Sequence, residues 1–92
     1  MTQKKFVEPP PCNPAPYTIP DVVSVQALAS GTASADQQKR ALKWLIENAA
    51  GTYDLEYRSD ARDHAFTSGR RFVGLQVVKL LHLNVAKLKK EQ

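Results

Sequence analysis

Hydrophobic residues in the middle of the chain recur at the spacing of a helix face. Between residues 35 and 50, apolar side chains follow one another at intervals of three and four positions, at Ala41, Leu42, Leu45, Ile46 and Ala49. This is the period of an α-helix that buries one side. Ser34 and Gln37 have the spacing of a capping box at its start, and Gly51 can end it. The pattern predicts a helix over about residues 35–50.

A shorter helix is predicted before it, over residues 20–30. Pro20 suits the first helical position, where its missing amide would have had no partner. Asp21 suits the positive end of the helix dipole. A short apolar stripe follows at Val22, Val25, Leu28 and Ala29. Gly31 can take the left-handed conformation that ends a helix.

The third and longest helix is predicted to start at a cap formed by Ser59 or Asp60. We expect it to run to about residue 83, and the pattern would also allow it to continue to Lys89. Its expected core stripe comprises Ala65, Phe66, Gly69, Phe72, Val73, Gln76, Val77 and Leu80. The residues expected to dominate the core of the domain are Leu45, Ile46, Phe66 and Phe72.

The far side of this third helix is apolar as well. Leu75 and Val78 fall outside the core stripe, so the segment from Phe72 to Leu83 is apolar almost all round. A helix of that kind is normally buried on both sides. Two short helices cannot surround a third, so we expect the second face to be covered by the N-terminal arm, by a second copy of the chain or by another protein.

The two remaining segments lack helical periodicity. Residues 1–19 contain five prolines, which prevent helix and ladder formation. We expect a flexible, extended arm that is either disordered or laid across a groove on a neighbour. In residues 51–59, Tyr53, Leu55 and Tyr57 alternate with polar residues. Because this segment has no partner strand, we expect an ordered loop that tucks its aromatic side chains under the helices.

These elements define an all-α fold, namely a small helical hairpin or three-helix domain over residues 20–92 that follows an extended proline-rich arm. The chain has 92 residues, and a helical part of about 70 residues usually needs a staple or a partner to be stable. The most apolar run, from Phe72 to Leu83, contains polar residues and is shorter than the roughly 20 residues of a membrane span. We therefore expect a soluble protein with no membrane partner.

The formal charge of +4 is concentrated toward the C-terminus. Basic residues outnumber acidic ones there, at Arg70, Arg71, Lys79, Lys87, Lys89 and Lys90. Such a surface can contact phosphate groups or an acidic protein. A solvated helix face with a frayed lysine tail is the simpler interpretation. These six residues are the candidate phosphate-binding positions, should the protein bind nucleic acid.

The residue combinations needed for catalysis are missing from the sequence. Cys12 is the only cysteine, which excludes an intramolecular disulfide and favours a reducing, cytosolic location. Asp63 and His64 are adjacent, so on a helix they do not face each other. The acidic residues between positions 54 and 63 lack the spacing of a calcium loop. We expect no catalytic site, no metal, no cofactor and no small-molecule substrate.

The best candidate for a binding site is the run from Gly69 to Gly74, which reads Gly-Arg-Arg-Phe-Val-Gly. Arginine grips carboxylates or phosphates with two parallel hydrogen bonds. Each glycine inside a helix costs about 1 kcal/mol relative to alanine, and such glycines usually reflect close packing against another backbone. The expected partner-binding residues are Arg70, Arg71, Gly74, Leu75 and Val78.

Three segments between residues 37 and 83 carry a family resemblance. They are Arg40–Ile46, Thr52–Asp54 and above all Phe66–Leu75, with its glycine-arginine-arginine block. Together they resemble a small domain family of tailed bacteriophages, whose genes lie among virion-structure and packaging genes and to which no enzymatic activity is attached. The resemblance implies a phage origin, a location in the host cytoplasm or the virion, and a role in particle assembly or genome handling.

We therefore expect a non-catalytic accessory or minor structural protein of virion assembly, which contacts its own copies or other phage or host proteins. Two alternatives stay open. One is a small DNA-binding factor in genome packaging, although the link of about nine residues between the second and third helices is longer than in a helix-turn-helix. The other is a host-takeover protein that binds and inhibits a bacterial protein.

Overall fold

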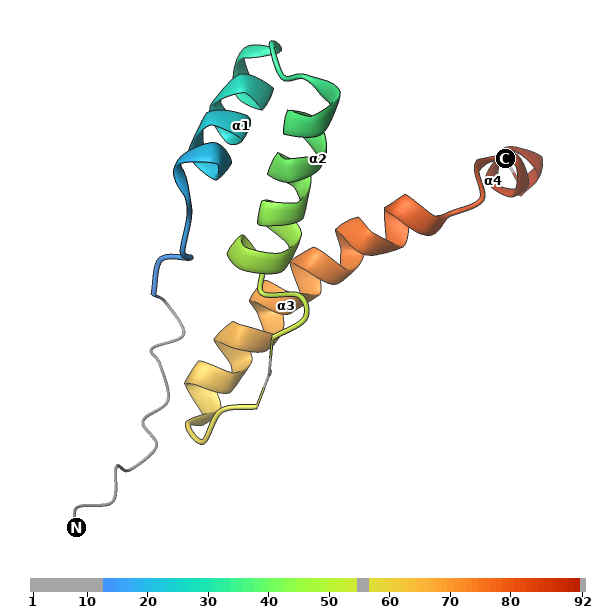
Figure 1. The fold of residues 1–92 in the computed structure, drawn as a ribbon. Helices are drawn as coiled ribbons and strands as arrows, with labels where there is room; N and C mark the ends of the chain where they lie inside the picture. Colours follow the sequence, from blue (N-terminus) through green and yellow to red (C-terminus); the bar gives the residue numbers. More distant parts are fainter. Residues whose placement is uncertain (1–12, 55–56, 92) are drawn as a thin grey trace.

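The computed structural model describes residues 13–54 and 57–91 of the chain. Across this part the chain forms helices and no strand (Figure 1), which confirms the expected all-α fold. The elements are α1 (Ile19–Ser30), α2 (Ala35–Trp44), the π-helical turn η1 (Leu45–Ala49), α3 (Ala61–His82) and α4 (Val85–Glu91). Cys12 and most of the expected proline-rich arm lie outside the described residues.

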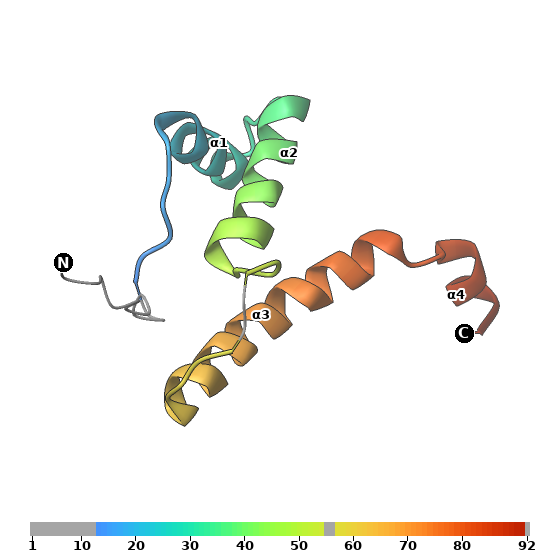
Figure 2. The same ribbon diagram turned by 60° about the horizontal axis from the view of Figure 1, so that its bottom comes forward.

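α1 and α2 pack side by side as a helical hairpin (Figures 1 and 2). Gly31 ends α1 in the left-handed conformation expected for it, with a φ angle of 76°. The capping box of α2 also forms. Ser34 Oγ accepts from the Gln37 amide at 3.2 Å, and Gln37 Oε1 accepts from the Ser34 amide at 2.9 Å. The helices predicted over residues 20–30 and 35–50 are confirmed.

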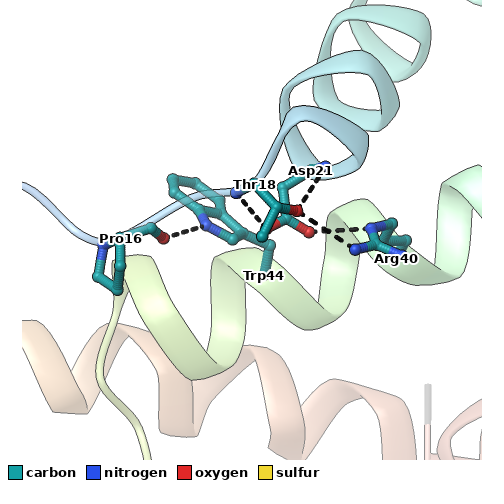
Figure 3. A network of polar contacts seen from close by, with 5 residues as sticks. All are labelled: Pro16, Thr18, Asp21, Arg40 and Trp44. Carbon is teal, nitrogen blue, oxygen red and sulfur yellow. Dashed lines mark hydrogen bonds and ion pairs between the residues drawn. The ribbon is translucent and has the colours of Figure 1, made fainter.

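The start of α1 is tied to α2 by a small polar network (Figure 3). Thr18 and Asp21 form a second capping box, in which Asp21 Oδ2 accepts from the Thr18 amide at 2.9 Å, so α1 begins one residue earlier than predicted. Arg40 Nε donates to Asp21 Oδ1 at 2.9 Å, and Trp44 Nε1 donates to the Pro16 carbonyl at 2.9 Å. The last residues before α1 are therefore held against α2.

The second helix widens at its C-terminal end into the π-turn η1. The Ala50 amide donates to the Leu45 carbonyl at 2.9 Å, a spacing of five residues. Gly51, with a φ angle of 59°, then turns the chain back. The amide and the hydroxyl of Thr52 both donate to the Ile46 carbonyl, at 3.1 and 2.7 Å. As a result, Thr52 is completely buried.

α3 crosses this end of the hairpin at Gly74 (Figure 2). A Cβ atom placed on Gly74 would collide with Thr52 Oγ1 and lie 2.9 Å from Ala50 Cβ. Gly74 is therefore closely packed, but against the side chains of Thr52 and Ala50 and not against another backbone as predicted. At Gly69 an added Cβ atom would have no neighbour within 4 Å, so this glycine has no such explanation inside the described chain.

A side-chain cap starts α3, and an extended residue ends it. Asp60 caps the start as predicted, because its Oδ1 accepts from two amides of the first turn at 2.9 and 3.1 Å. The predicted end near residue 83 is confirmed as well. The helix does not continue to Lys89, because Leu83 is extended and Asn84 Oδ1 accepts from the Lys87 amide at 3.1 Å. Asn84 thereby starts α4 as a separate helix.

The core of the described chain is small, and its buried apolar residues are Ala41 of α2 and Ile46 of η1. Ile46 is 7% exposed, as expected of a core residue. Leu45, Phe66 and Phe72 are 41, 48 and 61% exposed, so their assignment to the core was wrong. The side of α3 that packs inward carries Thr67 instead. An apolar stripe identifies a helix face that needs cover, but it does not identify what covers that face.

The segment after η1 also differs from the expectation. Tyr53 and Tyr57 are 69 and 67% exposed, so they do not tuck under the helices. Tyr57 instead lies beside the His64 ring, with 5.9 Å between the ring centroids. Within the described part of this segment, the side chain that is buried beneath the helices is that of Thr52. Leu55 lies outside the described residues.

The molecule is extended for its size. Its radius of gyration is 17.3 Å, against about 12 Å for a compact domain of this length. α3 projects past the α1–α2 hairpin, and α4 stands at its far end without packing on the other helices (Figure 1). The fold therefore leaves much of α3 without cover from the described part of the chain.

Candidate docking surface

One side of α3 carries a continuous row of exposed side chains. This side, named the open face here, comprises Ala65, Phe66, Gly69, Phe72, Val73, Gln76 and Leu80. The four large apolar members are between 48 and 69% exposed. These positions recur every three or four residues, which places them on one side of a helix. They are the residues that the sequence pattern assigned to the core, except for Val77.

The opposite side of α3 faces the hairpin. Thr67 and Gly74 are buried there, and Val77 and Val78 are half-buried. In Figures 1 and 2, α1 and α2 both lie on one side of α3. The described chain therefore packs α3 through Thr67, Gly74 and two half-buried valines, and leaves the aromatic residues of α3 in solvent. Exposed apolar patches of this kind usually mark an interaction site.

Arg70 and Arg71 point toward the loop that follows η1. Arg71 Nε donates to the Thr52 carbonyl at 2.8 Å. Arg70 Nη2 lies 3.9 Å from Asp54 Oδ2, close to the backbone of Gly51. Both guanidinium groups therefore brace this loop against α3, which is a structural role inside the chain.

The other expected partner-binding residues lie on the same inner side or at its edge. Gly74 is buried against Thr52, Val78 is half-buried, and Leu75 is 38% exposed. The structure therefore brings the five expected residues onto neighbouring turns, but none of them belongs to the open face. The open face exposes more apolar side-chain surface than these five residues do.

The candidate phosphate-binding residues are divided between two environments. Arg70 and Arg71 turn toward the loop, as described above, whereas the lysines are exposed on the second half of α3 and on α4. The exposed lysines are Lys79, Lys87, Lys89 and Lys90. The exposed basic surface at the C-terminal end therefore consists of lysines and does not include Arg70 and Arg71.

An apolar groove borders the open face. It lies between the second helix and α3 and has a volume of about 380 Å³. Leu42 and Leu45 form one wall, and Val73 and Val77 form the other. Val73 belongs to both surfaces, so the groove extends the exposed apolar area from α3 onto the hairpin.

Two structurally central residues were missed by the sequence reasoning. Thr52 is polar and follows a predicted turn, and no local pattern marks such a residue as buried. Trp44, the only tryptophan, lies away from the apolar stripe of the second helix. A large aromatic residue off the stripe is a signal for a second contact, and that contact is the bond from Trp44 to Pro16.

No group of three or more histidine, cysteine, aspartate or glutamate side chains among the described residues could hold a metal ion. The helices in this part of the chain are also too short or too polar to cross a membrane. Comparison of the chain with protein-family models, with curated proteins and with solved structures gave no match.

Proposed function

We propose that this chain is a non-catalytic docking protein, which takes part in the assembly of a larger particle through protein–protein contacts. The observation that carries the proposal is the open face of α3. Its large apolar side chains have helical spacing, remain about half or more exposed, and have no cover in the described chain.

The energetics of these side chains favour a docking role. Fully burying a valine, leucine or phenylalanine side chain is worth about 1.5–3 kcal/mol. Because the four large residues of the open face are between 48 and 69% exposed, each still has roughly 1 kcal/mol or more to gain from a partner. The hairpin packs on the opposite side of α3, so it cannot supply this burial without giving up the contact between Gly74 and Thr52.

The likeness of residues 37–83 to a tailed-bacteriophage family favours virion assembly as the setting. In that setting the chain acts as an accessory or minor structural protein and needs no active site. Its size suits such a role, because a chain with a small core gains stability from its neighbours in an assembly.

A second candidate function is DNA binding during genome packaging. It is favoured by the exposed lysines of α4, which could contact phosphate groups. It is weakened by Arg70 and Arg71, whose side chains turn toward the loop after η1. Duplex DNA binding that falls steeply between about 50 and 200 mM salt would identify this second function.

The proposed function is tested by particle incorporation. Phage particles are assembled with the wild-type chain, with Phe72→Asp or with Val23→Asp, purified on a gradient and analysed by mass spectrometry. Phe72 is 61% exposed on α3 and Val23 is 47% exposed on α1, so neither change disturbs a core. We expect the wild-type chain and Val23→Asp in the particles, and at least a tenfold loss of Phe72→Asp, because the charge cannot be buried at an apolar contact.

Two results would contradict the proposal. One is incorporation of Phe72→Asp at the wild-type level, which would place the docking surface elsewhere. The other is absence of the wild-type chain from the particles, which would remove the role in the virion. Circular dichroism of the three proteins verifies that their helix content is equal.

A further inference from the structure

We infer that the partner of the open face is a second copy of this chain, packed against it with the two α3 helices antiparallel. This inference rests on the proposed function and names the partner. A two-fold axis that passes between Phe72 and Val73 places both copies of these two residues at the centre of the contact. Two-fold pairing of one surface with itself is the commonest arrangement among soluble oligomers.

The order of large and small residues along the open face fits this pairing. About the same axis, Leu80 of one copy lies opposite Ala65 of the other, and Gln76 lies opposite Gly69. Leu80 and Gln76 therefore each meet a small residue, and the arrangement is repeated on the other side of the axis. Helices approach each other closely where a large side chain fits over a small one.

Gly69 is the second observation that supports the pairing. A glycine inside a helix weakens it relative to alanine. At Gly74 the contact with Thr52 explains the glycine, whereas Gly69 has open space around it within the described residues. Close approach of a second α3 helix at Gly69 would explain the glycine there, just as the contact with Thr52 explains the glycine at position 74.

The charges at the two ends of α3 favour the antiparallel orientation. Asp60 caps the helix, and Arg62 and Asp63 lie in its first turn, which leaves one net negative charge at this end, whereas Lys79 and His82 lie in the last turn. An antiparallel pair brings the acidic end of each helix near the basic end of the other, and it also pairs their dipoles favourably. A parallel pair would place like ends together.

The large residues of the open face supply about half of the area that a standard dimer interface buries. α3 has 22 residues and is therefore about 33 Å long. Aromatic side chains offer about 150–250 Å² each when fully buried, so Phe66 and Phe72, which are 48 and 61% exposed, supply roughly 200 Å² per copy. Val73 and Leu80 bring the total to roughly 400 Å². The polar edges of the helix and the adjoining groove bring this toward the roughly 800 Å² per partner of a standard interface.

The association is tested by sedimentation equilibrium up to about 100 μM, where a micromolar Kd is well exceeded. We expect the wild-type chain and Val23→Asp to have twice the 10.2 kDa mass of one chain, and Phe72→Asp to have the mass of one. A wild-type chain that stays at the mass of one copy at the highest concentration would overturn the inference.

The orientation is tested by disulfide formation between two single-cysteine variants. Cys12 is first replaced by serine, and Ala65→Cys and Leu80→Cys are then made separately and mixed. Mild oxidation of the antiparallel dimer yields a disulfide between residue 65 of one copy and residue 80 of the other. Disulfides that form only between like variants would overturn the antiparallel geometry.

These results separate the inference from the function on which it rests. A monomeric wild-type chain that still requires Phe72 to enter particles would overturn the second copy as partner and leave the docking function intact. A dimer that is absent from particles would support the second copy as partner and contradict the role in the virion.

Discussion

The two glycines inside α3 have opposite surroundings, although they are only five positions apart. Gly74 lies under Thr52 and Ala50, at the point where α3 crosses the end of the hairpin. Gly69 lies on the open face and has no neighbour within 4 Å of an added Cβ atom. A single methyl group therefore has different consequences at the two sites. This difference tests directly which side of α3 packs inside the chain.

Alanine at these two positions should change stability in opposite directions. Helix propensity favours alanine over glycine by about 1 kcal/mol, so Gly69→Ala should raise the free energy of unfolding by about that amount. At Gly74 the added methyl group overpacks the contact with Thr52, at a cost of about 1–3 kcal/mol. The same helix-propensity gain offsets about 1 kcal/mol of that cost, so Gly74→Ala should lower the free energy of unfolding by up to about 2 kcal/mol. Urea unfolding followed by circular dichroism measures both.

The measurement is best made in the Phe72→Asp background, so that association at Gly69 does not contribute to the result. A shift of the urea midpoint in the same direction for both alanine variants would contradict the packing at Gly74. The matched pair also controls for helix propensity, because both sites lie inside the same helix.

At the scale of the elements, the sequence predicted the helix caps correctly but not which side of α3 packs against the hairpin. The cap at Ser34, the left-handed Gly31 and the cap at Asp60 each depend on bonds within a few residues, so spacing in the sequence was enough to predict them. The inward side of α3 depends on Thr52, which reaches it from a different element. No periodicity within α3 contains that information.

The tie between α1 and α2 should weaken in acid. The bond accepted from the Thr18 amide, with smaller contributions from the Thr18 hydroxyl and from Arg40, lowers the pKa of Asp21 below its ordinary value of 3.8. Because the folded pKa is lower than the unfolded one, the stabilisation is present above pH 3.8 and is lost as the pH falls through the folded pKa.

Fluorescence of Trp44 reports this tie, because its indole N–H is bound to the Pro16 carbonyl beside Asp21 (Figure 3). Between about pH 6 and pH 2 we expect a transition in the wild-type chain whose midpoint lies below 3.8. In Asp21→Asn this transition should be absent. Identical curves for the two proteins would show that Asp21 does not control the tie.

At the scale of the whole molecule, the described chain is elongated and has few buried residues. The sequence pattern predicted that α3 would need cover on both sides, and a long helix with exposed apolar residues agrees with that expectation. The pattern exchanged the inward and outward sides of α3, because it placed Phe66 and Phe72 inward and Gly74 outward. Hydropathy alone favours that assignment, since it cannot represent a helix that packs through a glycine and a threonine.

The central claim is that the open face is covered by another protein surface in the functional state. Hydroxyl-radical footprinting of the dilute chain and of the assembled chain tests it most directly. We predict that Phe66 and Phe72 are oxidised readily in the dilute chain and are protected several-fold on assembly, while Tyr17 and Tyr53, each 69% exposed, remain equally reactive. Oxidation of Phe66 and Phe72 at the same rate in both states would contradict the claim.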